Sequence, residues 1–467
     1  MGHGLRVAVL GQGSIGRRHA GLLGELGAEV VTFDPFSPAD TDDEARALAG
    51  AAVAVVASPS AEHEAQALRC IAAGVPVLVE KPLALDAWGA ARVAAAGARA
   101  GVGVAVAMNL RHHPGVQGVR AALPQIGRPL RAAVWCGSYL PGWRPGADYR
   151  QAYSAQRALG GGVLLDAIHE IDELLWLLGP VRSVAALLPQ VSDLELDVED
   201  VAQLQLELVS GVPATVTLDY LDREYHRGAR VVGAEATVAW DWTAEQVVVH
   251  GGDGARAVVP AAADAAPTYR EELAALLASV EAGGGALAGA SPADGHHALQ
   301  VVDAARASAA TGRRVPVGLA LRPAGLEDAE RLRAWRNEPA TVAASLTVAE
   351  VDEAEHRVWL SRVLAAGDRT LWIVEDSGRP AGSVRLDLVG DGSAEVSIAL
   401  DAAARGLGLA ATALELLTAR ARAAGAVTGL LARVRESNAP SLRAFARAGY
   451  AEAGRADGVV TLRRTVP

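Results

Sequence analysis

Lysine is nearly absent from this chain of 467 residues, because Lys81 is the only lysine among its 43 Lys and Arg residues. A guanidinium stays protonated and needs a wide planar slot, whereas an ammonium is a compact charge that can lose its proton when desolvated. A composition this rich in Ala, Gly and Arg indicates that arginine has replaced lysine wherever it serves equally well. We therefore expect Lys81 to lie where arginine does not serve; a surface lysine retained by chance is the alternative.

The chain also has few cysteines, no long apolar run and no positive net charge. Cys70 and Cys136 are too few for a disulfide framework and lack the spacing of a metal site, which favours a reducing, cytoplasmic environment. No apolar run approaches ~18 residues and no signal-like segment opens the chain, so we expect no membrane span. The formal net charge of -11 argues against nucleic-acid binding and against a basic membrane-surface role.

Glycine is abundant, and at the N-terminus it forms a pattern. Residues 5–10 read as a short apolar strand, and the turn after it contains Gly11, Gly13, Ser14, Ile15 and Gly16. Such glycines allow a tight turn and let a pyrophosphate approach the N-terminus of the next helix. A second strand, residues 30–33, ends in Asp34, whose carboxylate can bind ribose hydroxyls and would repel a 2′-phosphate. This order of elements predicts a Rossmann domain that prefers NAD to NADP; a glycine turn without a ligand is the alternative.

Two later strands end in residues that can carry chemistry. The strand at residues 53–57 precedes Ser58, Pro59 and His63, and the strand at residues 77–79 precedes Glu80 and Lys81. Parallel α/β sheets place their ligands beyond the carboxyl ends of the strands. We therefore expect Lys81 at a catalytic centre and the other four residues at the cofactor.

A glycine-rich run at residues 160–172 completes a set of spaced motifs. It contains Asp166, His169 and Asp172. With the segments above and with residues 109–114 and 311–317, the chain resembles the Gfo/Idh/MocA oxidoreductases over roughly residues 4–318.

This resemblance implies two domains in the first part of the chain. A Rossmann domain is expected at residues 1–121. An α+β domain with an open, mostly antiparallel sheet is expected at residues 122–318, with its last helix packed back on the Rossmann half. The resemblance also implies a homo-oligomer formed through the open sheet and an NAD-dependent reaction at a sugar or cyclitol carbon.

The residues themselves suit hydride transfer from a secondary alcohol, which needs a base for the hydroxyl proton and a cation for the developing alkoxide. Lys81 can supply the cation and relay the proton, and His169 suits the base because imidazole titrates near neutrality. Asp166 and Asp172 lie three residues to either side of His169, so on one helix either can orient the imidazole. A surface acid is the alternative for Asp172. Many relatives space the first acid and the histidine four apart rather than three.

An aromatic segment at residues 139–150 resembles a subset of this family from nucleotide-sugar biosynthesis. Its arginines, Arg144 and Arg150, can bind a substrate phosphate. Arginines on a solvated loop are the alternative for each.

A second composition begins near residue 319. Strand and helix patterns lead to a strand at residues 395–400 and then to a loop and a long apolar helix, with Arg405, Gly406, Gly408 and Ala410. Such a loop can direct backbone N–H groups at a pyrophosphate. Over roughly residues 319–464 the chain resembles the GNAT acetyltransferases. In that family the loop holds coenzyme A, and a later helix contacts the coenzyme. This chain matches that helix from Asn438 onward. The resemblance implies an α+β domain at residues 319–467 that uses acetyl-CoA.

Within that superfamily, the segments around Trp335 and His356 resemble the branch that acetylates amino sugars on nucleotides, with ribosomal-protein N-acetyltransferases as neighbours. Glu395 can take the amine proton through water, and a surface strand acid is the alternative. Phe445 stands where many GNAT enzymes have a tyrosine acid. Phenylalanine cannot protonate a thiolate and Tyr450 is not an evident substitute, so no residue is assigned as the leaving-group acid.

The sequence thus predicts an α/β protein with a Rossmann domain, an open-sheet domain and a GNAT domain. We expect a bifunctional cytoplasmic enzyme that uses NAD and acetyl-CoA on a nucleotide-linked amino sugar. Two alternatives stay open: a dehydrogenase fused to an acetyltransferase for protein amines, and a non-catalytic sugar-nucleotide sensor. Intact Lys81 and His169 count against the sensor.

Overall fold

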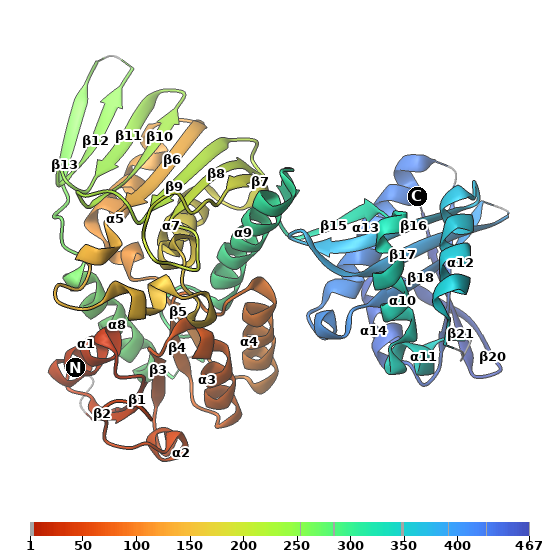
Figure 1. The fold of residues 1–467 in the computed structure, drawn as a ribbon, viewed down its shortest axis with the longest axis horizontal. Coiled ribbons are helices and arrows are strands. Elements are labelled where there is room, and N and C mark those ends of the chain that lie inside the picture. The colour runs from red at the N-terminus through yellow and green to blue at the C-terminus, as the bar shows by residue number, and fades with distance from the viewer. Residues whose placement is uncertain are drawn as a thin grey trace. The chain divides into compact units, whose positions relative to one another are not determined.

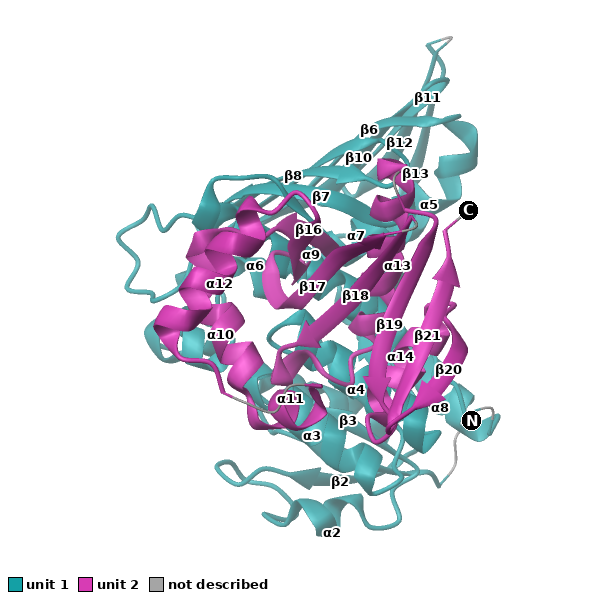
Figure 2. Ribbon diagram, turned by 90° about the vertical axis from the view of Figure 1, so that its right-hand side faces the viewer, with its two compact units in different colours: residues 1–317 teal, residues 318–467 magenta. Residues whose placement is uncertain are grey.

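The computed structural model describes residues 4–252, 254–283, 285–346, 350–390, 392–425 and 427–466. The chain forms two compact units, residues 1–317 and residues 318–467 (Figure 2). None of the helices in the described ranges combines the length and the apolar character that crossing a bilayer requires.

The first unit opens with a five-stranded parallel sheet in the order β2-β1-β3-β4-β5 (Figure 1). Its strands are β1 (Arg6–Leu10), β2 (Glu29–Phe33), β3 (Val53–Val56), β4 (Val77–Glu80) and β5 (Val104–Ala107). The helices around it are α1 (Ser14–Glu25), α2 (Glu44–Leu48), α3 (Ser60–Ala72), α4 (Ala87–Ala100) and α8 (Ala266–Glu281). Apolar residues of α3 and α4 pack on one face and those of α1 and α8 on the other. Strands covered on both faces are apolar throughout, which explains the unbroken apolar runs of β1 and β3.

A nine-stranded sheet follows in the order β13-β12-β11-β10-β6-β9-β8-β7-β14. The strands are β6 (Pro129–Gly137), β7 (Val181–Leu187), β8 (Val201–Leu208), β9 (Pro213–Asp219), β10 (His226–Gly233), β11 (Ala236–Asp241), β12 (Gln246–Gly251), β13 (Arg256–Pro260) and β14 (Val315–Pro316). All neighbouring strands are antiparallel except the pair β6 and β9. Buried and exposed residues alternate along β8 and β9, so one face of the sheet is covered and the other is open.

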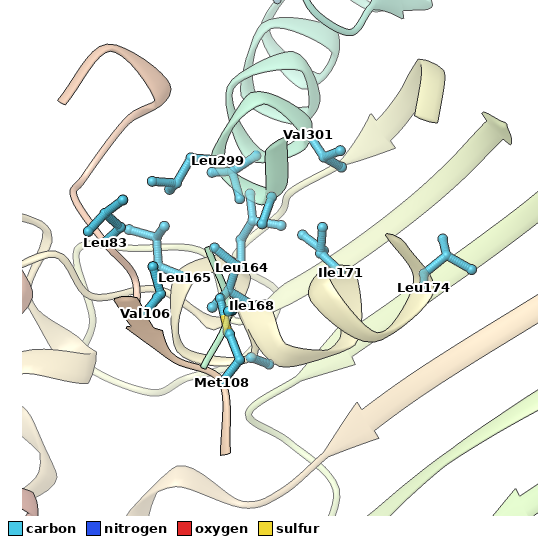
Figure 3. Packing of buried hydrophobic residues seen from close by; sticks show 14 of the residues in the cluster. Leu83, Val106, Met108, Leu164, Leu165, Ile168, Ile171, Leu174, Leu299 and Val301 are labelled. Carbon is cyan, nitrogen blue, oxygen red and sulfur yellow. The ribbon is translucent and has the colours of Figure 1, made fainter. Parts of the chain in front are cut away.

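Helices α5 (Pro114–Ala122), α6 (Val163–Asp166), α7 (Ile168–Leu178) and α9 (Pro292–Thr311) complete the first unit. Figure 3 shows that α6 and α7 bury one continuous apolar cluster together with α9 and with residues at the ends of the Rossmann strands. Its labelled members are Leu83, Val106, Met108, Leu164, Leu165, Ile168, Ile171, Leu174, Leu299 and Val301. Helix α9 also returns to the Rossmann sheet, where Asp303 accepts a hydrogen bond from the Ala87 backbone N–H at 2.9 Å. This packing fixes the corner between α6 and α7 beside the end of β4.

The second unit has a seven-stranded sheet in the order β15-β16-β17-β18-β19-β21-β20. Its strands are β15 (Leu319–Pro323), β16 (Arg369–Asp376), β17 (Arg379–Gly390), β18 (Ser393–Leu400), β19 (Gly429–Arg435), β20 (Ala451–Ala456) and β21 (Val459–Thr465). Its helices are α10 (Ala329–Asn337), α11 (Pro339–Ala344), α12 (Glu353–Ala365), α13 (Leu409–Ala424) and α14 (Ala439–Arg447). The predicted fold class is confirmed: a Rossmann sheet, an open mixed sheet and a separate α+β unit.

Short 3₁₀ turns connect these elements. They are η1 (Asn109–His112), η2 (Leu123–Gln125), η3 (Leu140–Gly142), η4 (Tyr149–Gln151), η5 (Tyr153–Ala155), η6 (Arg157–Leu159), η7 (Leu326–Asp328) and η8 (Ala402–Ala404). Four of them, η3 to η6, fall between β6 and α6. The long connection that contains the aromatic segment is therefore built from local turns rather than from a further strand or helix.

Candidate active sites

The turn after β1 leaves room for a pyrophosphate. Gly11 has φ +98°, and a Cβ there would lie 2.6 Å from the Ser58 backbone nitrogen, so only glycine lets β1 and β3 approach at this point. A Cβ at Gly16 would collide with the Gly11 carbonyl. Gly13 caps the N-terminus of α1, which begins at Ser14 and Ile15, and a Cβ at Gly13 would meet no atom within 4 Å. The helix N-terminus is thus open to an anion between β1 and β3, where the strand order of the sheet reverses.

Asp34 holds the loop at the other end of this site. One of its oxygens accepts a hydrogen bond from the Gln12 backbone N–H at 2.7 Å, and the other accepts from Phe36 and Ser37 at 2.8 and 2.9 Å. Residues 34–42 line a pocket of about 470 Å³ that contains Asp34, Asp40 and Asp42. Hydrogen bonds from the Thr32 backbone and hydroxyl lower the pKa of Asp40, so this carboxylate is charged at neutral pH.

We expect NAD(H) to bind at least ten-fold more tightly than NADP(H), a difference of about 1.4 kcal/mol. A 2′-phosphate in this pocket would face several carboxylates and no described basic partner. Fluorescence titration with NADH and with NADPH measures the two dissociation constants directly. Equal constants would contradict the assignment of Asp34.

His63 and Glu80 are buried and hold the strand ends. The two ring nitrogens of His63 lie 2.7 Å from the Pro82 carbonyl and 2.9 Å from the Ser58 carbonyl. Burial lowers the pKa of His63, and a neutral imidazole has one N–H, which can serve only one carbonyl at a time. Pro59 precedes α3 as its N-cap residue. These contacts shape the ends of β3 and β4, and a direct contact of His63 with the cofactor stays a prediction.

Glu80 pairs with a histidine from α1. His19 Nε2 lies 2.7 Å from Glu80 Oε1, and the second carboxylate oxygen accepts the Lys81 backbone N–H at 3.2 Å. Burial alone would raise the pKa of Glu80, but the hydrogen bond from His19 and the nearby charges hold it below its ordinary value. The Glu80 side chain therefore fixes the backbone from which Lys81 projects.

Lys81 reaches from the end of β4 to the corner between α6 and α7. Its Nζ donates a hydrogen bond to the Asp166 backbone carbonyl at 2.7 Å. Burial, together with the charges of Lys81 and Arg227, holds the pKa of His169 well below its ordinary value. The structure therefore brings Lys81, Asp166 and His169 together at one corner.

The two acids do not orient His169, contrary to the sequence-based expectation. Helix α6 ends at Asp166, Ala167 leaves helical geometry with φ −98° and ψ 34°, and α7 starts at Ile168. Asp166 Oδ2 accepts a hydrogen bond from the Tyr220 hydroxyl at 2.6 Å. Among the described residues, His169 Nδ1 has no hydrogen-bond partner.

Asp172 forms an ion pair with an arginine instead. Its two oxygens accept hydrogen bonds from Arg111 at 2.8 and 2.6 Å, which forms a bidentate pair between α7 and η1. A second buried pair joins Arg227 of β10 to Glu170 at 2.6 Å. Sequence reasoning did not find Arg227, Glu170 or Tyr220. The one available signal was that Glu170 directly follows His169.

The two arginines of the aromatic segment have different surroundings. Arg150 is neutralised by Asp148 at 2.8 Å and by Glu195 at 2.6 Å. Arg144 lies over the Tyr153 ring, with its guanidinium carbon 5.9 Å from the ring centroid, and pairs with no carboxylate in the described part of the chain. Only Arg144 therefore fits the predicted role of an available phosphate-binding cation.

In the second unit, two parallel strands diverge. β18 and β19 pair only from Ser393 to Glu395 and from Gly429 to Leu431, although both strands continue beyond. Glu395 is the last paired residue, and its carboxylate accepts hydrogen bonds from Arg433 at 2.9 and 3.1 Å. Arg433 thus pairs with the carboxylate that the sequence predicts to take the amine proton. The catalytic role of Glu395 stays a prediction.

The loop before α13 contains two glycines with free space beside them and an arginine that is held by hydrogen bonds. Gly406 and Gly408 both have φ +82°, a Cβ at either would meet nothing within 4 Å, and Gly408 caps α13, whose first turn contains Ala410. Arg405 donates hydrogen bonds to Glu338 at 2.7 Å and to Thr341 at 2.8 Å, so its guanidinium joins the loop to α11. Backbone N–H groups and the helix N-terminus therefore offer the anion site here.

The remaining signature residues of this unit make contacts within the protein, and the coenzyme contact of Asn438 stays a prediction. Asn438 caps α14 by accepting the Ser441 backbone N–H at 3.2 Å. Trp335 Nε1 donates to Asp401 at 2.7 Å, and His356 is 3% exposed. Phe445 is buried, and burial raises the pKa of Tyr450, whose hydroxyl is enclosed, to about 12. Trp335 and His356 thus make contacts within the protein, and the amino-sugar acceptor that their segments suggested stays a prediction.

Comparison with known proteins identifies both units. Residues 28–108 match the NAD-binding Rossmann fold of the Gfo/Idh/MocA oxidoreductase family, residues 120–239 match the C-terminal domain of that family, and residues 319–451 match the acetyltransferase (GNAT) domain. Inositol 2-dehydrogenase 2 of Saccharopolyspora erythraea is 33% identical over 333 residues, which cover 69% of this chain and 90% of that protein. Inositol 2-dehydrogenase of Acidothermus cellulolyticus is 28% identical over 65% of this chain and 92% of the relative.

Two solved structures share the fold of the first unit. GenD2 from gentamicin A biosynthesis, in complex with NAD, is 26% identical with a TM-score of 0.56 and covers 68% of this chain and 97% of its own. Levoglucosan dehydrogenase in complex with NADH and levoglucosan is 21% identical with a TM-score of 0.60, covering 68% and 99%.

The fold, the glycine turn and these matches define an enzyme with an NAD-binding dehydrogenase of the sugar or polyol type. The chain belongs to the Gfo/Idh/MocA oxidoreductases and carries a GNAT acetyltransferase domain, whose cosubstrate is acetyl-CoA.

Proposed function

We propose that the protein is a bifunctional enzyme for a nucleotide-linked amino sugar. The first unit oxidises or reduces a ring carbon with NAD, and the second transfers an acetyl group from acetyl-CoA to the amino group. The observation that supports this most is the presence of two separately built sites on one chain, one around Lys81 and one at Gly408. Two sites on one chain favour a shared pathway, and therefore a substrate that offers both a hydroxyl and an amine.

In the first unit, the N-terminus of α1, Lys81 and His169 have separate roles. The open N-terminus of α1 holds the pyrophosphate of NAD, and NAD supplies the hydride chemistry when bound. Lys81 stabilises negative charge on the reacting oxygen, because its ammonium is held at the corner by the Asp166 carbonyl at 2.7 Å. His169 lies at the same corner and stays neutral there, which suits a hydrogen-bonding contact with a substrate hydroxyl.

In the second unit, the N-terminus of α13 holds the coenzyme pyrophosphate, and the gap between β18 and β19 admits the thioester arm. Glu395, at the mouth of this gap, takes the amine proton through water. We also propose that copies of the chain associate through the open face of the nine-stranded sheet, and that the domain boundaries fall near residues 121 and 318.

Incubating the full chain with NAD⁺, acetyl-CoA and a panel of acceptors tests the proposal. The panel contains nucleotide amino sugars, myo-inositol and N-terminal peptides, and mass spectrometry follows the loss of two hydrogens and the gain of one acetyl group. We expect both changes on a nucleotide amino sugar. Acetylation of peptides alone would favour a protein acetyltransferase, and no change on any compound would favour a sensor.

Arg144 should contribute to binding of a phosphate-bearing substrate. We expect Arg144→Ala to raise KM for a nucleotide sugar about ten-fold, since charge-assisted hydrogen bonds contribute roughly 1.5–3 kcal/mol. The matched control is Arg150→Ala, which should leave KM nearly unchanged because Asp148 and Glu195 already occupy that guanidinium. Steady-state kinetics with myo-inositol gives a second control, because a substrate without phosphate should not respond to either change.

A further inference from the structure

The connection between β6 and α6 exposes a tryptophan that the protein holds in place. Trp143 is 41% exposed. Its Nε1 donates a hydrogen bond to the Ser138 hydroxyl at 2.8 Å, and its ring packs at 87° to the buried Tyr220 ring, with centroids 5.4 Å apart. The indole is therefore fixed by its polar edge and by a ring contact, and the rest of its surface is free for stacking.

The backbone on either side of this tryptophan borders open space. A Cβ at Gly142, which directly precedes Trp143, would meet no atom within 4 Å. The same is true of Gly146, which lies three residues after Trp143. There is therefore room for a ligand along the indole without displacement of protein atoms.

Two arginines in this region stack on tyrosines instead of pairing with acids. The guanidinium carbon of Arg223, in the turn between β9 and β10, lies 3.6 Å from the centroid of the Tyr139 ring. That of Arg144 lies 5.9 Å from the centroid of the Tyr153 ring. Neither guanidinium forms an ion pair in the part of the chain that the structure describes. A guanidinium that stacks through its face keeps the N–H groups of its edge for two-point bonds to a phosphate.

The two arginines lie on adjacent segments. The Leu140 backbone N–H donates a hydrogen bond to the Tyr220 carbonyl at 3.0 Å. The segment that leads to Trp143 and Arg144 therefore runs beside the turn that contains Arg223. One exposed indole and two unpaired cations thus belong to the same region of the first unit.

The acids at the end of β9 do not neutralise these cations. Asp219 Oδ1 accepts two backbone N–H groups of the turn, at 2.9 and 2.8 Å. Asp222 Oδ2 lies 2.9 Å from His226 Nδ1. Glu224 is exposed and forms no ion pair with Arg223 among the described residues. An anionic ligand therefore meets cations that have no carboxylate partner.

A chain of contacts links the indole to the dehydrogenase corner. Tyr220, against which Trp143 packs, donates a hydrogen bond to Asp166 Oδ2 at 2.6 Å. The Asp166 carbonyl accepts the Lys81 ammonium at 2.7 Å. In a nucleotide-linked sugar, the diphosphate lies between the sugar and the base. The protein contacts follow the same order, with the reacting corner at one end and the exposed indole at the other.

We propose that Trp143, Arg144 and Arg223 bind the nucleoside diphosphate part of the substrate. The indole stacks on the base, and the two guanidiniums hold the diphosphate. The inference rests on the proposed nucleotide-linked substrate and names the residues that recognise its nucleotide. Every base has a π face, so this surface selects for a nucleoside diphosphate rather than for one particular base.

Calorimetric titration of the full chain with UDP, GDP, dTDP and inorganic pyrophosphate tests the site. Saturating NADH and coenzyme A keep the two cofactor sites occupied. We expect the wild type to bind at least one nucleoside diphosphate more tightly than pyrophosphate. Trp143→Ala should weaken nucleotide binding about ten-fold and leave pyrophosphate binding unchanged. Arg223→Ala should weaken the binding of both about ten-fold.

Two further variants separate recognition from damage to the fold. Trp143→Phe keeps a stacking face and should bind the nucleotide within about three-fold of wild type. Arg150→Ala removes an arginine of the same segment that already pairs with Asp148 and Glu195, and should bind like wild type. The NADH dissociation constant should be the same in every variant. Wild-type nucleotide binding by Trp143→Ala and Arg223→Ala, or an equal loss in Trp143→Phe and Trp143→Ala, would overturn the site.

Kinetics distinguish a failure of this site from a failure of the proposed function. With a nucleotide amino sugar, Trp143→Ala, Arg144→Ala and Arg223→Ala should each raise KM about ten-fold and leave kcat within about three-fold, because they remove contacts that are equal in the ground and transition states. Oxidation of that sugar with wild-type KM in all three variants would refute this site and leave the substrate class standing. A wild type that oxidises only myo-inositol and binds no nucleoside diphosphate would refute both proposals.

Discussion

Lys81→Arg should abolish oxidation and reduction while leaving NAD binding and acetyl transfer close to wild type. Lys81 projects from the end of β4, and its ammonium is held 2.7 Å from the Asp166 carbonyl at the corner of α6 and α7. A guanidinium keeps the charge but is planar and larger, so it cannot place a compact cation at the same point. Loss of one preorganised donor beside a developing oxyanion costs roughly 2.7–4 kcal/mol, about a hundred- to a thousand-fold in rate.

The measurement compares three quantities on the same preparation. NADH formation with the active panel member reports the dehydrogenase, NADH fluorescence reports cofactor binding, and release of free coenzyme A reports acetyl transfer. Retention of more than about a tenth of the wild-type redox rate, roughly 1.4 kcal/mol in barrier, would show that Lys81 is not central. Loss of NADH binding as well would point to a misfolded corner, because Glu80 and His19 share it.

Local sequence patterns were enough to predict the fold class of both units. The glycine turn between β1 and α1 and the turn between β16 and β17 are decided by neighbours in sequence, because positive φ angles limit the residues that fit. Ser377 and Gly378, with φ 51° and 83°, form the two-residue turn of the hairpin between β16 and β17. The position of Lys81 at a strand end is equally local, since an apolar strand of known direction places it.

The partners of the charged residues could not be predicted in this way. Asp172 pairs with Arg111 from another element, and Arg405 pairs with Glu338 across the second unit. Helical periodicity shows which residues share a face, but packing decides which charge lies opposite. The break at Ala167 has the same origin: the apolar cluster of Leu164, Leu165 and Ile168 fixes both helices, and the acid follows their geometry.

Gly408→Val should remove acetyl-CoA binding while leaving the redox reaction intact. Gly408 has φ +82° and caps α13, and a Cβ there would meet no protein atom within 4 Å. The side chain would therefore not clash with the protein; it would fill the space before the helix N-terminus, where a pyrophosphate must contact backbone N–H groups. The left-handed backbone adds a strain of roughly 1–2 kcal/mol.

Gly425 provides the control that separates strain from lost binding. It ends the same helix with φ +70°, and a Cβ there also meets nothing within 4 Å. Gly425→Val should thus carry a similar backbone strain at the opposite end of α13, away from the loop. Calorimetric titration with acetyl-CoA should show no binding for Gly408→Val and near wild-type binding for Gly425→Val. Equal binding in the two variants would place the coenzyme elsewhere, and equal loss would mean that strain in α13 alone disrupts the site.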